Sequence, residues 1–130
     1  MANQSQTGFA AELFCAAELA KQGHLVTITF GNEKAIDLLV AKADDPKTVR
    51  SVDVKGLAKP ADWVMSGYLK KSRHPDVYLF CLLGPPQQRP SYFIVPKRDV
   101  DRIIAGCKDP NWIGFEMLDN FKEKWGLLWT

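Results

Sequence analysis

Residues 35–56 read AIDLLVAKADDPKTVRSVDVKG, and the rest of the chain is arranged around this stretch. It contains two apolar runs joined by a polar turn that includes a proline. Strands are typically bounded by such turns, so the pattern predicts strands over residues 35–43 and 50–56. Because the turn at residues 44–46 is short, we expect the two strands to be antiparallel neighbours.

Charged side chains lie where the interior of a sheet should have none. Asp37 is embedded in the first apolar run. In the second run, the period-two alternation of a strand sends Val52 and Val54 to one face and Asp53 and Lys55 to the other. Burying carboxylates among aliphatic side chains is costly unless a cation or strong donors meet them. Two such carboxylates with one lysine therefore predict a metal site.

The other predicted elements are a helix over residues 7–22, strands over 24–30, 77–83 and 91–95, and helices over 97–105 and 117–125. Ser5 or Thr7 is expected to cap the first helix, and Gly23 to end it. The segment between the strands over 50–56 and 77–83 is long enough for a crossover, so these strands can be parallel. Pro60, Gly67 and Pro75 exclude a long regular helix from that segment.

Glu12 lies on an apolar row of the first helix, with Gly8 one turn earlier. One interpretation is a third acidic group aimed at the metal site, for which the small glycine leaves room. The alternative is a boundary residue whose carboxylate reaches outward to water.

An acid within a strand, followed by an acid-x-lysine on the next strand, resembles the PD-(D/E)xK nuclease superfamily. The matching residues are Asp37 and the run Asp53-Val54-Lys55, with Glu12 as the acid on an earlier helix. Ile36 stands where the motif has proline, and the second acid is an aspartate, one methylene shorter than glutamate.

The length of the chain predicts a single domain over residues 1–130. The resemblance covers roughly residues 7–96 and implies a restriction-endonuclease-like αβββαβ core, that is, a mixed central sheet flanked by helices. It also implies a metal-dependent nuclease that hydrolyses phosphodiester bonds. Asp37, Asp53 and the carbonyl of Val54 would bind Mg²⁺ or Mn²⁺, Glu12 would bind a second metal or its waters, and Lys55 would orient the attacking water.

The basic residues are unevenly distributed. Residues 47–73 contain seven basic and two acidic residues, whereas the whole chain has a net charge of only +2. Such a segment can hold a phosphate backbone, and Lys59, Lys70, Lys71 and Arg73 are the predicted nucleic-acid-binding residues. DNA is the favoured substrate. The alternative is a solvated surface of lysines with no ligand.

Composition sets the remaining expectations. The chain has 130 residues with 46% apolar and 25% charged residues, as is usual for a globular domain, and no apolar run long enough to span a membrane. Three cysteines without metal-ligand spacing predict reduced thiols and a cytoplasmic protein. A homodimer would supply a second cleft for a second strand. The candidate dimer surfaces are Trp63, Met65, Tyr68, Trp112 and Phe115.

Two other classes of protein fit parts of the pattern. A catalytically silent member of the fold could bind nucleic acid or a partner protein. An unrelated α/β domain could instead use Asp37 and Asp53 in structural ion pairs with Lys55, Lys34 or Arg50.

Overall fold

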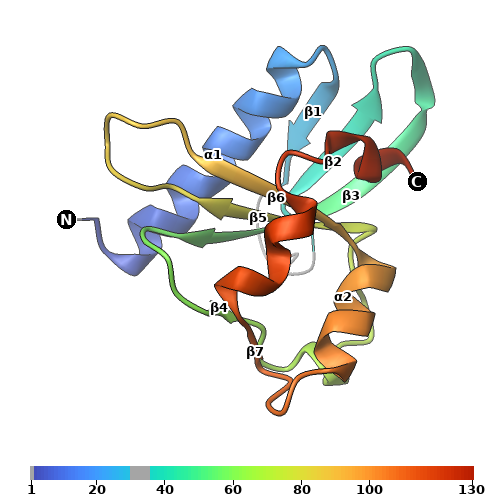
Figure 1. The fold of residues 1–130 in the computed structure, drawn as a ribbon. Coiled ribbons are helices and arrows are strands. Elements are labelled where there is room, and N and C mark those ends of the chain that lie inside the picture. The colour runs from blue at the N-terminus through green and yellow to red at the C-terminus, as the bar shows by residue number, and fades with distance from the viewer. Residues whose placement is uncertain (1, 30–35) are drawn as a thin grey trace.

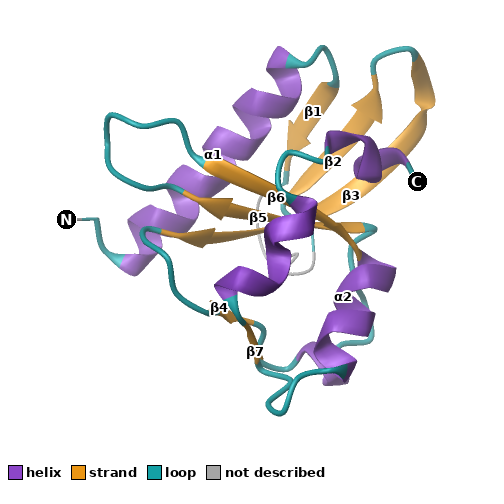
Figure 2. Ribbon diagram, in the orientation of Figure 1, coloured by secondary structure: helices purple, strands orange, loops and turns teal. Residues whose placement is uncertain are grey.

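The computed structural model describes residues 2–29 and 36–130. Helix α1 is followed by strands β1 to β6, with a short 3-10 helix between β4 and β5, and then by helix α2 and a tail that contains a seventh strand (Figure 1, Figure 2). The bounds are α1 (Gln4–Lys21), β1 (Leu25–Ile28), β2 (Leu38–Lys42), β3 (Asp45–Leu57), β4 (Trp63–Val64), η1 (Tyr68–Lys70), β5 (Val77–Leu82), β6 (Ser91–Pro96), α2 (Lys97–Ala105), β7 (Trp112–Ile113), η2 (Phe115–Phe121) and η3 (Trp125–Trp129).

The main sheet is mixed and has the strand order β1-β2-β3-β5-β6. Strands β1, β2 and β3 form an antiparallel meander, β5 runs parallel to β3, and β6 pairs antiparallel with β5. This confirms the predicted α/β class, the meander and the parallel crossover. The crossover itself contains β4 and η1 and no α-helix, and β4 pairs with β7 in a separate small sheet.

Helix α1 packs on one face of the sheet and forms the first core with it. It begins at Asn3, whose side chain accepts a hydrogen bond from Gln6 in a capping box, so the predicted caps Ser5 and Thr7 are wrong. It ends where expected, because Gly23 adopts the left-handed φ of 97°. The helix contributes the buried side chains of Ala11, Cys15, Ala16 and Leu19, which meet alternate residues of β2, β3 and β5.

The second core lies on the opposite face of the sheet. Tyr78 and Phe80 of β5 point into it, together with the segments that follow β3 and β6. Trp63, Met65 and Tyr68 are at most 3% exposed and belong to this core. They were predicted as dimer surfaces, and for these three residues that prediction is wrong because α2 and the tail cover them. Of the other two candidates, Trp112 is exposed and Phe115 is half-buried.

The tail differs from its predicted helix over residues 117–125. Two short 3-10 helices, η2 and η3, replace it, and Trp125, Leu127 and Leu128 pack on the first core. Helix α2 has the predicted bounds. Within this helix, Asp99 is only 9% exposed and pairs with Arg102.

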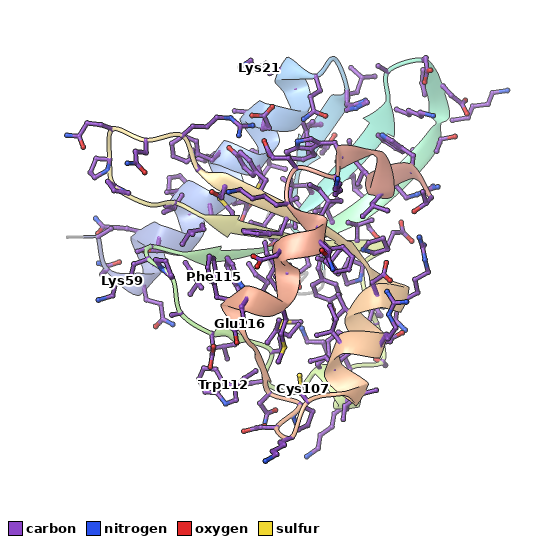
Figure 3. The ribbon with its side chains drawn as sticks, in the orientation of Figure 1. Lys21, Lys59, Cys107, Trp112, Phe115 and Glu116 are labelled. Atoms are coloured by element: carbon purple, nitrogen blue, oxygen red, sulfur yellow. The ribbon has the colours of Figure 1, made fainter. Side chains whose placement is uncertain are left out.

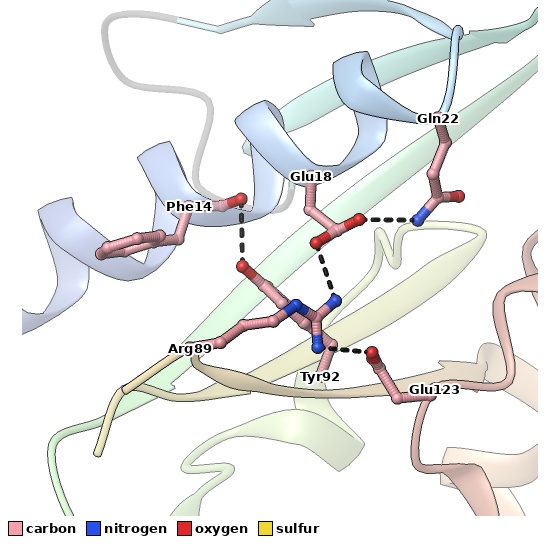
Figure 4. A network of polar contacts seen from close by, with 6 residues as sticks. All are labelled: Phe14, Glu18, Gln22, Arg89, Tyr92 and Glu123. Carbon is pink, nitrogen blue, oxygen red and sulfur yellow. Dashed lines mark hydrogen bonds and ion pairs between the residues drawn. The ribbon is translucent and has the colours of Figure 1, made fainter. Parts of the chain in front are cut away.

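Arg89 forms ion pairs that connect three segments distant in the sequence (Figure 4). Arg89, in the loop between β5 and β6, lies 2.7 Å from the carboxylate of Glu18 on α1 and 2.6 Å from that of Glu123 in the tail. Its guanidinium also stands over the ring of Tyr92, 5.0 Å from the centroid. This contact fixes the exposed loop against the body of the protein.

Some predictions fall on residues outside the described ranges. These are the end of the first strand at Phe30, the turn at Gly31 and Asn32, the start of the next strand at Ala35, and the cation Lys34. Within the described ranges, none of the helices has the length and apolar composition needed to cross a bilayer.

Candidate functional site

The site is built on the middle of β3. Val52 lies in the first core and Val54 packs against it, so Asp53 and Lys55 point to the opposite face, as the alternation predicted. The Asp53 side chain is only 4% exposed, and the Lys55 ammonium lies 3.5 Å from its Oδ2 atom. A carboxylate and an ammonium are therefore held together at the edge of the second core.

Asp37 joins this pair from the neighbouring chain segment. It immediately precedes β2 instead of lying inside the strand, as had been predicted. Its backbone N–H donates to the carbonyl of Val52 at 2.8 Å, and its Oδ2 atom accepts a hydrogen bond from the N–H of Val54 at 2.7 Å. Thr29 of the preceding segment donates its hydroxyl to the carbonyl of Ile36 at 2.5 Å, which fixes the approach to β2.

Strand geometry indicates the direction of the Val54 carbonyl. Strand β2 begins at Leu38 opposite Val52, so it does not extend as far as Val54. In an antiparallel pair one residue directs both its N–H and its C=O toward the same neighbouring strand. Since the Val54 N–H meets Asp37, the carbonyl of Val54 points to that side too, where the ladder has ended.

The electrostatics of Asp53 set it apart from an ordinary surface acid. The pKa of Asp53 is raised to about 7, chiefly by burial and also by the nearby Asp37 carboxyl. The positive charges of Lys55 and Lys71 oppose this rise. Its Oδ2 atom has no hydrogen-bond partner among the described residues. Without a further cation, the Asp53 carboxyl can hold a proton near neutral pH.

Glu12 reaches the same region from α1. It is half-buried, and burial together with the charge of Asp37 raises its pKa. Its neighbours are Asp37 and Cys15, and the raised pKa of Cys15 arises chiefly from burial. No three His, Cys, Asp or Glu side chains of the described ranges form a group that could hold a metal ion. The expected three-carboxylate cluster is therefore not formed, and a metal-binding role for Glu12 stays a prediction.

A divalent cation nevertheless fits the smaller donor set. Asp37 and Asp53 bring two carboxylates together, and the Val54 carbonyl points to the same side. One oxygen of Asp53 is buried and has no hydrogen-bond partner within residues 2–29 and 36–130. Hard cations prefer such oxygen ligands, and a bound cation would remove the repulsion between the two acids.

Of the structural ion pairs considered as an alternative for Asp37 and Asp53, only part is present among the described residues. Lys55 does pair with Asp53, but only at 3.5 Å. Arg50 instead stands over the ring of Trp129, 5.9 Å from the centroid. Lys34 lies outside the described residues, so its pairing is not described.

Comparison with known proteins gives one informative match. No protein-family model matches the chain, and no curated protein does. Among solved structures, the bacterial homing endonuclease I-Ssp6803I aligns with 98% of this chain and 91% of its own, with a TM-score of 0.68 and 15% sequence identity. The chain has an endonuclease-like fold. At this identity the likeness concerns the fold alone.

On this endonuclease-like fold, the predicted nucleic-acid-binding residues are dispersed. Lys59 follows the end of β3 and lies near the N-terminal end of α1 (Figure 3), while Lys70 and Arg73 are exposed in the crossover. Only Lys71 is half-buried, and its charge acts on Asp53. The structure thus brings one of the four close to the carboxylates.

Sequence reasoning missed the aromatic and imidazole groups beside the site. Tyr78 is the parallel-register partner of Asp53, and its hydroxyl lies 2.9 Å from Nδ1 of His74. Burial and the nearby charge of Asp53 raise the pKa of Tyr78. The predicted parallel pairing of the two strands was the signal that could have placed Tyr78 here, but it did not fix the register.

Two surface hollows lie elsewhere. One, of about 380 Å³, lies between α1 and the loop that carries Arg89, and the other, of about 560 Å³, lies around Cys107 and Trp112. Neither is lined by Asp37, Asp53 or Lys55.

Proposed function

We propose that this protein is a metal-dependent nuclease that hydrolyses phosphodiester bonds, with DNA as the favoured substrate. The observation that carries the proposal is the meeting of Asp37, Asp53 and Lys55 at the middle of β3, within an endonuclease-like fold. The fold alone would leave the function open, because one fold serves many functions. The residues at the site support phosphodiester chemistry.

Each residue has a role that follows from its chemistry. Asp37, Asp53 and the Val54 carbonyl would hold Mg²⁺ or Mn²⁺. When bound, such a cation supplies charge neutralisation for the phosphate and a more acidic water. Lys55 would orient the attacking water by hydrogen bonding and stabilise negative charge on the phosphate oxygens. Glu12, nearest to Asp37, would contribute to a second metal or its waters.

Nuclease assays on purified protein test the proposal. DNA duplexes, single strands and branched substrates should be cleaved with Mg²⁺ or Mn²⁺ and remain intact with EDTA. Asp53→Ala and Lys55→Ala should lower the rate by at least about 100-fold, as expected when a charged group acting on the transition state is lost. The matched controls are Asp44→Ala and Lys124→Ala, which change exposed residues away from the site and should retain activity.

Two outcomes would overturn the proposal. Cleavage that survives in both site variants would mean that another protein or another site is responsible. A wild-type protein that binds DNA without cutting any of the three substrate types would favour the catalytically silent binding module.

A two-fold homodimer that presents a second cleft stays a prediction, to be checked by sedimentation with and without a duplex.

A further inference from the structure

The crossover between β3 and β5 is fastened at two points beside the site. At the first, the Tyr68 hydroxyl donates to Oδ1 of Asp101 on α2 at 2.6 Å, and Lys97 donates to the other oxygen of Asp101 at 2.9 Å. The Tyr68 ring is 3% exposed and lies 5.7 Å from the ring of Tyr78. The start of η1 is thereby anchored to both α2 and β5.

The second point is His74. Its Nδ1 atom lies 2.9 Å from the Tyr78 hydroxyl, and its ring lies 4.5 Å from that of Tyr68. Tyr78 pairs in register with Asp53, and side chains of paired residues in a parallel sheet lie on the same face. His74 therefore holds the end of the crossover segment next to the strand position that carries Asp53.

Lys71 lies midway between these two anchors. Its N–H donates to the Tyr68 carbonyl at 3.3 Å, which closes η1. It is half-buried, whereas Lys70, one position earlier, is exposed. In the described part of the chain no carboxylate lies within ion-pairing distance of Lys71, while Lys55 is already paired with Asp53. An ammonium that is not paired with a carboxylate of the described residues can bind an incoming anion through charge-assisted hydrogen bonds.

We propose that Lys71 is a second ammonium of the site and binds a phosphate group of the nucleic acid that is cut. The inference rests on the proposed function for the identity of the ligand. It assigns distinct roles to the two lysines. Lys55 stays beside Asp53 and acts at the reacting phosphate, while Lys71, which has no ion pair among the described residues, binds a phosphate of the backbone. Lys70, pointing to solvent, contributes only to the general positive field.

Binding measured without divalent metal tests this inference apart from catalysis. A short fluorescent DNA duplex should bind Lys71→Met about tenfold more weakly than the wild type, and the slope of log K against log salt should fall in magnitude by about 1. Lys70→Met is the matched control and should change affinity no more than about twofold, while Lys71→Arg should restore binding. If Lys71→Met and Lys70→Met bind alike, the inference is wrong.

A second measurement checks the location of Lys71. Burial, followed by the charges of Lys97 and Lys71, lowers the pKa of His74, and Asp101 opposes them. By NMR titration, Lys71→Met should raise the pKa of His74, and Lys70→Met should leave it unchanged. An unshifted His74 in Lys71→Met would contradict the placement. If the wild type cleaves no substrate but both measurements succeed, the proposed function fails while the phosphate-binding role of Lys71 stands.

Discussion

At the scale of single residues, the charged form of Asp53 is held in an unfavourable environment. Its carboxyl is buried, faces a second carboxyl, and has one lysine at 3.5 Å as compensation. Burial and Asp37 raise its pKa to about 7, from a value near 3.8 in an unfolded chain. The folded protein therefore binds a proton at Asp53 more tightly than the unfolded chain does. Between these two pKa values, a rise in pH must lower the free energy of unfolding.

We predict that Asp53→Asn stabilises the metal-free protein at pH 8 and flattens its stability between pH 5 and 8. The neutral amide removes the charge that the wild type must carry above pH 7, and the gain should be about 1–3 kcal/mol. Urea denaturation in EDTA at a series of pH values measures it. Asp44→Asn, which alters an exposed carboxylate, should keep the wild-type pH dependence. An Asp53→Asn protein as pH-dependent as the wild type would show that Asp53 titrates normally.

At the scale of elements, the contact between α1 and β3 sets the distance between Glu12 and the carboxylates on the sheet. That contact is close because Gly56 of β3 has no side chain. A Cβ atom at this position would lie 2.6 Å from Cβ of Ala11 and 3.3 Å from the carbonyl oxygen of Thr7. Helix and strand can approach this closely only with glycine there.

Gly56→Ala should therefore push α1 away from β3 and destabilise the protein by about 1–3 kcal/mol, the usual cost of overpacking. Gly8→Ala is the matched control, because nothing lies within 4 Å of its added Cβ atom. It should stabilise the helix by about 0.5–1 kcal/mol. Chemical denaturation of both variants checks the pair. Equal effects of the two substitutions would mean that helix and strand are not in close contact.

The same elements show which parts of the site could be predicted from the sequence alone. Alternation along one strand was enough to place Asp53 and Lys55 on a common face, because a strand interior admits charges only for a reason. It could not distinguish Lys71 from Lys70, since their burial depends on where Tyr68 and His74 anchor the crossover. The regular helix predicted over residues 117–125 is wrong, because the tail instead forms two short 3-10 helices that pack against β6.

At the scale of the whole molecule, the site exists only in the folded chain. Asp37, Asp53 and Lys71 come from the start of β2, the middle of β3 and the crossover, and a mixed sheet with α2 behind it brings them together. An unfolded chain offers a cation two separate carboxylates, each weakly binding. A cation that binds the folded site must therefore stabilise the fold, since ligands that prefer the native state shift the equilibrium toward it.

We predict that millimolar Mn²⁺ or Mg²⁺ raises the melting temperature of the wild type. A concentration 100 times the Kd adds about 2.7 kcal/mol, which corresponds to roughly 10 °C for a domain of this size. Asp53→Asn should melt higher than the wild type in EDTA and gain little from the metal, because it has lost both the repulsion and a ligand. Asp44→Asn should respond as the wild type does. Calorimetric scans of the three proteins, with and without Mn²⁺, provide the measurement. A wild-type melting temperature that is unmoved by Mn²⁺, or one that rises equally in Asp53→Asn, would mean that Asp37 and Asp53 do not hold the cation and serve only as partners of Lys55.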